Sequence, residues 1–185
     1  MTATTPIDPP ADGLERAIVG GGCFWCTDSV FRAVRGVKAV ASGYAGGARP
    51  GPSYAQICSG ATGHAEVVAI DFDPSLISYA RVLDIFFATH DPTTIDRQGN
   101  DIGSQYRSVI FYTSDAQQQT AAATIAQLKA DGIKVVTELS PAPVFYRAEE
   151  YHQDYFNKNP EQGYCSFMIP PKLSKLKKYF ADDAL

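Results

Sequence analysis

The sequence lacks a long apolar run, an excess of basic charge and internal repeats, and these absences exclude several classes of protein. No apolar stretch among the 185 residues approaches the ~20 residues that a membrane-spanning helix needs, so we expect no membrane partner. A net charge of −4 and a pI near 5.3 argue against a general nucleic-acid binder. With 45% hydrophobic and 19% charged residues, the composition is that of an ordinary soluble protein.

The N-terminus also lacks the basic start and the apolar core of a signal peptide, so we predict a cytoplasmic protein. Residues 1–14 are expected to form a flexible leader. Residues 15–185 are expected to form a single catalytic domain, because this length suffices for one core and hardly for two. Without an export signal, the cysteines indicate redox or metal chemistry rather than a disulfide framework. The four cysteines are Cys23, Cys26, Cys58 and Cys165.

Hydrophobic periodicity and turn residues predict an alternating order of strands and helices. Strands are expected at residues 16–19, 37–44, 64–72, 106–112 and 133–139, and helices at residues 26–35, 78–90, 114–131 and 148–157. Ser53 is expected to cap one or two further turns of helix through Cys58, and Ser114 to Gln117 fit a capping box at the start of the helix at residues 114–131. This order matches a ferredoxin-like βαββαβ core, so we predict an α/β (α+β) fold, a two-layer sandwich with a mixed sheet. Residues 159–185 contain Pro170-Pro171 and are expected to wrap around the core as a long irregular C-terminal segment.

One stretch combines glycines, two cysteines and two aromatic rings: Gly20-Gly21-Gly22-Cys23-Phe24-Trp25-Cys26. The glycines allow a tight turn and a close backbone approach by another molecule. This turn leads from a predicted strand into a predicted helix. Cys23 should therefore lie at the helix N-terminus, where free N–H groups and the helix dipole favour a thiolate. A buried, inert cysteine is the alternative, but the coincidence of turn, cysteine and helix start favours a nucleophile.

Cys23 and Cys26 form a Cys-x-x-Cys pair, and three interpretations of Cys26 stay open. Such pairs serve disulfide exchange or metal binding. For disulfide exchange with a partner chain, Phe24 and Trp25 are a poor linker, whereas they are a good lining for a small apolar group. A zinc site needs two more ligands at matched spacing, but the other cysteines and His64 are scattered singly. Alternatively, Cys26 simply faces the core.

Three polar residues have both a structural and a catalytic interpretation. Glu66 lies inside a predicted strand, so it either points to solvent or is a desolvated carboxyl with a raised pKa that can donate a proton. Tyr54 and Tyr106 are either half-buried packing residues or hydroxyl donors beside a reactive cysteine. From position alone, the two interpretations of Glu66 weigh equally.

The segment of residues 90–105 has no hydrophobic period and is long for a loop in a compact domain, which favours a functional role. Asp101 lies within it and is either a turn-stabilising residue or part of a site. His152, in the predicted helix at residues 148–157, is expected to pack against neighbours or to face solvent.

Taken together, the motifs along the chain resemble the A-type peptide-methionine (S)-S-oxide reductases. The resemblance extends from about Ala17 to Lys178, and the ordered set is highly specific although each motif alone is weak. The motifs are Gly22-Cys23-Phe24-Trp25, Ser42-Gly43-Tyr44-Ala45-Gly46-Gly47, Cys58-Ser59-Gly60-Ala61-Thr62-Gly63-His64-Ala65-Glu66, His90-Asp91-Pro92-Thr93-Thr94, Gly99-Asn100-Asp101-Ile102-Gly103-Ser104-Gln105-Tyr106-Arg107-Ser108, Tyr151-His152-Gln153-Asp154-Tyr155 and Gly163-Tyr164-Cys165.

This resemblance implies an enzyme that reduces methionine-(S)-sulfoxide, free or in proteins, and thereby repairs oxidised proteins. By this resemblance, Cys23 attacks the sulfoxide sulfur and Glu66 protonates the sulfoxide oxygen. Tyr54 and Tyr106 hydrogen-bond that oxygen. Methionine leaves, and Cys23 becomes a sulfenic acid that a second cysteine captures as a disulfide.

The resemblance also implies how substrate and reductant bind. Phe24 and Trp25 hold the methyl group, and Asp101 helps to shape the site. A thioredoxin-like electron donor reduces the disulfide by thiol exchange. No metal, flavin or nucleotide cofactor is implied, and a monomer is expected.

The resolving cysteine is the point at which the chain departs from the best-known members. Many of those have a small residue in place of Cys26, and many carry a glycine-rich tail with a further cysteine that this chain lacks. Cys165 matches the tail cysteine of the family and is the favoured resolving residue. Cys26 is the alternative, provided that a helical Cys-x-x-Cys disulfide has acceptable geometry, and Cys58 is a weaker third candidate.

Overall fold

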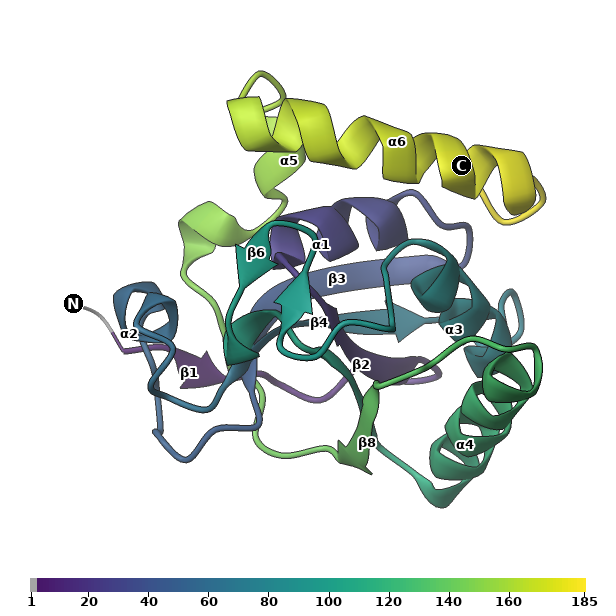
Figure 1. The fold of residues 1–185 in the computed structure, drawn as a ribbon, viewed down its shortest axis with the longest axis horizontal. Helices are drawn as coiled ribbons and strands as arrows, with labels where there is room; N and C mark the ends of the chain where they lie inside the picture. The colour runs from purple at the N-terminus through teal and green to yellow at the C-terminus, as the bar shows by residue number, and fades with distance from the viewer. Residues whose placement is uncertain (1–2) are drawn as a thin grey trace.

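The computed structural model describes residues 3–185 and contains the predicted ferredoxin-like core. Its elements, in chain order, are β2 (Glu15–Gly21), α1 (Phe24–Arg32), β3 (Val37–Ala45), β4 (Ala65–Phe72), α3 (Tyr79–Ala88) and β7 (Ser108–Tyr112). The four strands lie in the order β3-β4-β2-β7, and each pair of neighbours is antiparallel (Figure 1). α1 connects β2 to β3 and α3 connects β4 to β7, which is the βαββαβ arrangement.

Further strands extend this sheet at both edges: β1 (Thr5–Pro6), β8 (Glu138–Pro141) and β9 (Tyr146–Arg147). β8 pairs parallel to β7, so the sheet is mixed, and β9 pairs with β3. β1 pairs with β9, and the N–H of Ile7 donates to the Phe145 carbonyl at 3.0 Å. Part of the predicted flexible leader is therefore an edge strand held by backbone hydrogen bonds; residues 1–2 of that leader lie outside the described residues.

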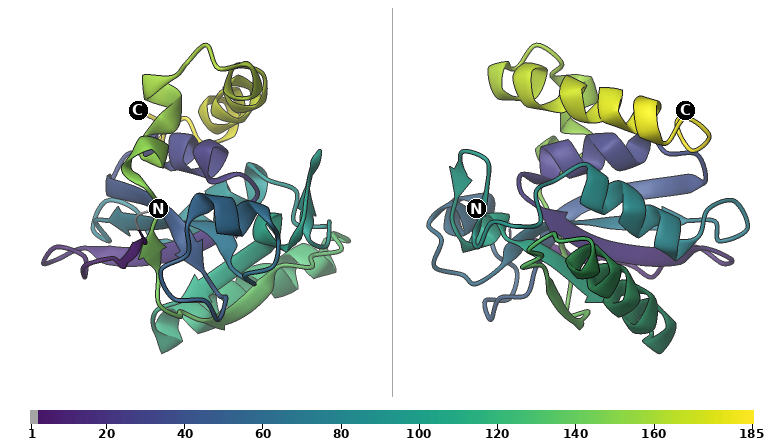
Figure 2. Two further views of the ribbon diagram at one scale, coloured as in Figure 1. Left: turned by 90° about the vertical axis from the view of Figure 1, so that its left-hand side faces the viewer. Right: turned by 45° about the vertical axis from the view of Figure 1, so that its right-hand side comes forward.

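The two faces of the sheet are covered differently. α1 and α3 lie on one face, where Val68 and Ile70 of β4 are buried in the main core (Figure 2). The opposite face carries Val67 and is covered by loop residues such as Phe145. Because side chains alternate along a strand, Glu66 shares the face of Val68 and points toward the helices.

The C-terminal segment contains a long helix, which corrects the predicted irregular tail. α6 (Gly163–Tyr179) continues through Pro170-Pro171 and packs across α1 on the side away from the sheet (Figures 1 and 2). Its buried residues Cys165, Ile169 and Leu176 share one helical face. Burial of this face outweighs the loss of the two proline N–H donors. No helix within residues 3–185, α6 included, is both long and apolar enough to span a membrane.

Two loop regions contain more local structure than the sequence pattern shows. The long segment after α3 folds into a hairpin of β5 (Arg97–Gln98) and β6 (Asp101–Ile102), followed by η1 (Ser104–Tyr106). Tyr106 therefore precedes β7 rather than opening a strand. The predicted helix at residues 148–157 is instead two short pieces, η2 (Glu150–His152) and α5 (Tyr155–Lys158), because Asp154 between them has a left-handed φ of 52°. α4 (Asp115–Ala130) begins at the predicted Ser114 cap.

The packing of α6 predicts the effect of truncating Leu176, which is 1% exposed in the main core. Leu176→Ala should lower the free energy of unfolding by about 2–5 kcal/mol, the usual cost of emptying a buried leucine site. Urea unfolding monitored by circular dichroism measures it. The exposed neighbour Lys177→Ala serves as the control and should change stability by less than about 0.5 kcal/mol. Equal stability of the two variants would show that α6 is not part of the core.

Candidate active site

The end of β2 and the start of α1 position Cys23. It is the N-cap residue of α1, as the sequence predicts, and its side chain is half-buried. Gly22 precedes it with a left-handed φ of 99°, and a Cβ there would lie 2.6 Å from Gln98 Cγ, so only glycine fits. At Gly20, an added Cβ would lie 2.8 Å from the Glu66 carbonyl oxygen. The glycines therefore let the backbone before Cys23 pass close to β4 and to the β5–β6 hairpin.

Glu66 is buried directly beneath the first turn of α1. Its carboxyl is 2% exposed, and its Oε1 accepts a hydrogen bond of 3.1 Å from the backbone N–H of Phe24. Burial raises the pKa of Glu66 to about 8, and the negative charge of Asp101 adds to this, although the Phe24 N–H acts in the opposite direction. Of the two interpretations of Glu66, the structure therefore favours the desolvated carboxyl, which is mostly protonated at pH 7.

A second buried network fixes Tyr54 at the start of α2 (Tyr54–Cys58). Ser53 caps this helix, as predicted, in a capping box with Gln56. The Tyr54 backbone N–H donates to Glu149 Oε2 at 2.9 Å, while Tyr44 Oη donates to Oε1 of the same carboxylate at 3.0 Å. Tyr44 is also the cross-strand neighbour of Glu66. The Glu149 carboxylate thus connects α2 to the strand beside Glu66.

Tyr54, Tyr106 and Asp101 converge on Glu66 from three different segments. Burial is the main cause that raises the pKa of both tyrosines, and the nearby Glu66 charge contributes to both. Both hydroxyls therefore remain protonated and able to donate hydrogen bonds. Asp101 Oδ2 accepts a hydrogen bond from Tyr164 Oη of α6, which ties the β5–β6 hairpin to the C-terminal helix.

Aromatic rings surround the first turn of α1. Trp25 stacks on Tyr155 with ring centroids 3.9 Å apart, and its indole N–H donates to His152 Nδ1 at 3.0 Å. His152 is fully buried, and burial lowers its pKa to about 4, so its ring is neutral and accepts this bond. Phe24 is buried between Tyr44 and His152. The two aromatic residues after Cys23 are therefore held in place rather than free to turn.

The thiols of Cys23 and Cys26 hydrogen-bond to each other. This contact, together with burial and the Glu66 charge, raises the pKa of Cys23 well above its usual value. The pKa of Cys26 is lowered, chiefly by the hydrogen bond from Cys23 and also by the ammonium group of Lys172. The pKa shifts thus favour a thiolate at Cys26 over the thiolate that the sequence predicts at Cys23, because the neighbours of Cys23 outweigh the helix N-terminus.

The other two cysteines lie on two different helices, Cys165 on α6 and Cys58 on α2. Cys165 is fully buried on α6, in one apolar cluster with Cys26 and Ile169, and burial raises its pKa to about 11. It is therefore fixed on a helix rather than delivered by a flexible tail. Cys58 is exposed at the end of α2, in hydrogen-bond contact with Tyr54.

The arrangement suits a substrate with one small polar group. A sulfur nucleophile stands beside a protonated carboxyl and two hydroxyl donors, so one bound group can be attacked and protonated in the same place. This is the chemistry of a thiol-dependent reductase. Within residues 3–185, no three His, Cys, Asp or Glu side chains are grouped as metal ligands.

Comparisons with known proteins identify which reductase family has this site. Residues 15–184 match the family described as peptide methionine sulfoxide reductase. A relative from Acinetobacter baumannii (strain AYE), named peptide methionine sulfoxide reductase MsrA, is 60% identical over 90% of this chain and 96% of its own length. Reduced Mxr1 from Saccharomyces cerevisiae superimposes with a TM-score of 0.79 at 35% identity, covering 90% of this chain and 94% of Mxr1. Mxr1 in complex with Trx2 gives a TM-score of 0.57 at 27% identity, over 80% of this chain and 89% of that one.

The chain therefore belongs to the peptide methionine sulfoxide reductase A family, and it is a peptide methionine sulfoxide reductase. Its substrate is methionine sulfoxide. The predicted family, enzyme class and α+β fold are confirmed.

Some residues of the site escape the sequence interpretation. Glu149 and Lys172 carry no local signal, because only the fold brings them to α2 and to Cys26. Tyr164 adjoins a motif cysteine, which was the one available hint of its position. His152 is expected to pack or to face solvent, and the structure shows it buried as the hydrogen-bond acceptor of Trp25.

The raised pKa of Glu66 generates a kinetic prediction. Glu66→Gln keeps the shape and the acceptor for the Phe24 N–H but removes the acidic proton, so sulfoxide reduction should slow about 10²- to 10⁴-fold. In the wild type, the single-turnover rate should fall as pH rises through about 8, because Glu66 loses its proton there. Rapid-quench quantification of methionine measures both. An unchanged rate in Glu66→Gln, with an unchanged melting temperature as proof of folding, would contradict this.

Proposed function

We propose that this enzyme reduces the S epimer of methionine sulfoxide through a sulfenic acid on Cys23. The observation that carries the proposal is the buried Glu66 carboxyl beneath the first turn of α1, beside the Cys23 thiol, where burial raises its pKa to about 8. Cys23 attacks the sulfoxide sulfur, Glu66 transfers its proton to the oxygen, and Glu66 takes up the proton that the Cys23 thiol loses. The sulfur–oxygen bond of the sulfoxide breaks, methionine leaves with the sulfur electron pair, and the oxygen passes to Cys23 as –SOH.

Substrate binding is assigned to the residues that converge on this pair. Tyr54 and Tyr106 hydrogen-bond the sulfoxide oxygen, since both hydroxyls remain protonated near Glu66. Phe24 and Trp25 hold the methyl group. Asp101 shapes the site by accepting the hydrogen bond of Tyr164. A chiral sulfoxide then fits in one orientation, because oxygen and methyl are recognised on different sides of the sulfur.

The disulfide step involves both Cys26 and Cys165 in this proposal. Cys26, already hydrogen-bonded to Cys23, attacks the sulfenic sulfur and releases water, which gives a Cys23–Cys26 disulfide. N-cap and N3 side chains of one helix lie next to each other, so the spacing suits this bond. Cys165, in the same cluster as Cys26, then exchanges to give a Cys26–Cys165 disulfide and free Cys23. The sequence favours Cys165 for the first step, and the thiol contact supports Cys26 instead.

A thioredoxin-like dithiol is the proposed final reductant. The support comes from the likeness to Mxr1, a protein whose structure is known in complex with Trx2. The protein's role is then the repair of oxidised methionine, in proteins or as the free amino acid. A cytoplasmic location, a monomeric state and a single domain at residues 15–185 stay predictions.

The epimer choice is tested with dithiothreitol as the reductant. The wild type should reduce methionine-(S)-sulfoxide and leave the R epimer unchanged, and Cys23→Ser should reduce neither. Chromatographic quantification of methionine follows the reaction. Reduction of the R epimer, or full activity of Cys23→Ser, would contradict the proposal.

The order of the disulfides is tested by mass spectrometry after one equivalent of substrate. Cys165→Ser should stop at a Cys23–Cys26 disulfide, whereas the wild type should accumulate Cys26–Cys165. Cys58→Ser is the control and should behave as the wild type, since Cys58 is exposed on α2. A Cys23–Cys165 disulfide with Cys26 free in the wild type would overturn this order and support the sequence preference.

A further inference from the structure

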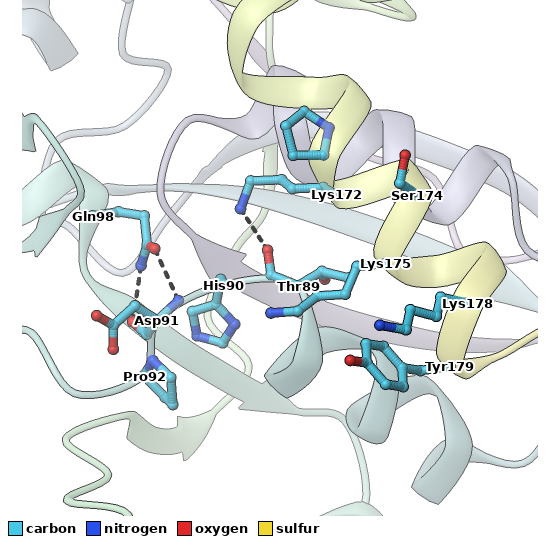
Figure 3. A pocket seen from close by; sticks show the side chains of 11 residues that line it. Thr89, His90, Asp91, Pro92, Gln98, Lys172, Ser174, Lys175, Lys178 and Tyr179 are labelled. Atoms are coloured by element: carbon cyan, nitrogen blue, oxygen red, sulfur yellow. Dashed lines mark hydrogen bonds between the residues drawn. The ribbon is translucent and has the colours of Figure 1, made fainter.

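A basic cleft lies between α6 and the segment that follows α3, separate from the residues of the active site (Figure 3). Its volume is about 660 Å³. Lys172, Lys175 and Lys178 line the α6 side, and their three-residue spacing places them along one face of the helix. His90 and Asp91 lie on the opposite side. We call this feature the lysine cleft.

The positive charge of the lysine cleft is not neutralised within residues 3–185. None of the three lysines forms an ion pair with a described carboxylate. Lys172 donates a hydrogen bond to the Thr89 carbonyl. Burial lowers the pKa of Lys172, and the positive charge of Lys175 also lowers it. Among the described lining residues Asp91 is the only acidic one, and Thr93 already donates two hydrogen bonds to it.

His90 also lines the lysine cleft. Burial lowers its pKa to about 4, so its ring adds no charge at neutral pH. Lys175 and Lys178 are both exposed, and Figure 3 shows their side chains on the cleft side of α6. A concave surface with three ammonium groups and one carboxylate attracts anions, although the whole chain has a net charge of −4.

Two lining residues connect the lysine cleft to the active site. Gln98 lies against Gly22, the residue before Cys23. Lys172 lies close enough to Cys26 to lower the pKa of its thiol. Along α6, the distance from Lys172 to Lys178 corresponds to ~9 Å of helix rise, or about three residues of extended chain. The lysine cleft therefore begins beside the Cys23–Cys26 region, and a polypeptide that ran from there along α6 would pass the lysines.

We propose that the lysine cleft binds aspartate and glutamate side chains of the substrate polypeptide, so that the enzyme favours oxidised methionines in acidic segments. This inference rests on the proposed function, because the peptide must present its sulfoxide to Cys23. Exposed ion pairs contribute modestly, so the lysine cleft confers a preference rather than a requirement. The preference weakens as salt concentration rises.

The test compares two peptides that contain methionine-(S)-sulfoxide, one flanked by glutamates on both sides and one with glutamines in their place. With dithiothreitol at low ionic strength, the wild type should show about three- to tenfold higher kcat/KM for the acidic peptide, mainly through KM. In the double variant Lys175→Gln/Lys178→Gln, this ratio should fall close to one. Lys129→Gln/Lys177→Gln also removes two positive charges, from exposed positions outside the lysine cleft, and should keep the wild-type ratio.

Each contrary result has a distinct meaning. Equal kcat/KM for the two peptides in the wild type, or a preserved ratio in Lys175→Gln/Lys178→Gln, overturns the proposal. A lysine effect that appears only with a thioredoxin donor also overturns it, and assigns the lysine cleft to the donor instead. Free methionine-(S)-sulfoxide has no flanking acidic residues, so failure of the wild type to reduce it counts against the proposed function, not against the lysine cleft.

Discussion

The carboxyl group of Glu66 lies near the start of β4 beneath the first turn of α1, and the rest of the site depends on its burial there. Gly20 lets β2 approach the Glu66 backbone, and Tyr44 covers it from the neighbouring strand. The Phe24 N–H satisfies one carboxyl oxygen. Burial of an ionised carboxylate costs more free energy than one such hydrogen bond returns, so the group retains its proton. In the proposed mechanism, that proton goes to the sulfoxide oxygen as its bond to the methionine sulfur breaks.

The same burial affects the neighbouring thiols. A charged Glu66 disfavours a thiolate on Cys23, whereas a neutral Glu66 removes that repulsion. The two groups are therefore matched: the form of Glu66 that can protonate the oxygen is also the form that allows Cys23 to react. The pKa of Cys26 is the lowered one of the thiol pair, which suits the attack on the sulfenic sulfur that we propose for it. α6 contacts the site through Tyr164, which donates a hydrogen bond to Asp101, and through Cys165, which lies in one apolar cluster with Cys26.

The core of the fold was readable from local patterns, because each core strand and helix has its own hydrophobic period and turn residues. The Ser53 and Ser114 caps were found in this way. α6 was not, because Pro170-Pro171 is a local signal against a helix and the burial of Leu176 against the core is a tertiary effect. The state of Cys23 was missed for a similar reason: the helix N-terminus is visible in sequence, whereas Glu66 and Cys26 oppose it through space. Motif order supplied the candidate site residues, but it carried no information on contacts such as Tyr54 to Glu149.

The proposed mechanism depends most directly on the protonation state of Glu66 in the resting enzyme. Carbon-13 NMR of protein labelled at the glutamate carboxyl carbons measures it, with the Glu66→Gln spectrum to assign the signal. The Glu66 signal should titrate with a pKa of about 8, because burial disfavours its charged form. A Glu66 signal that titrates near the ordinary value of 4.5 would show an ionised carboxylate at neutral pH and would contradict the account.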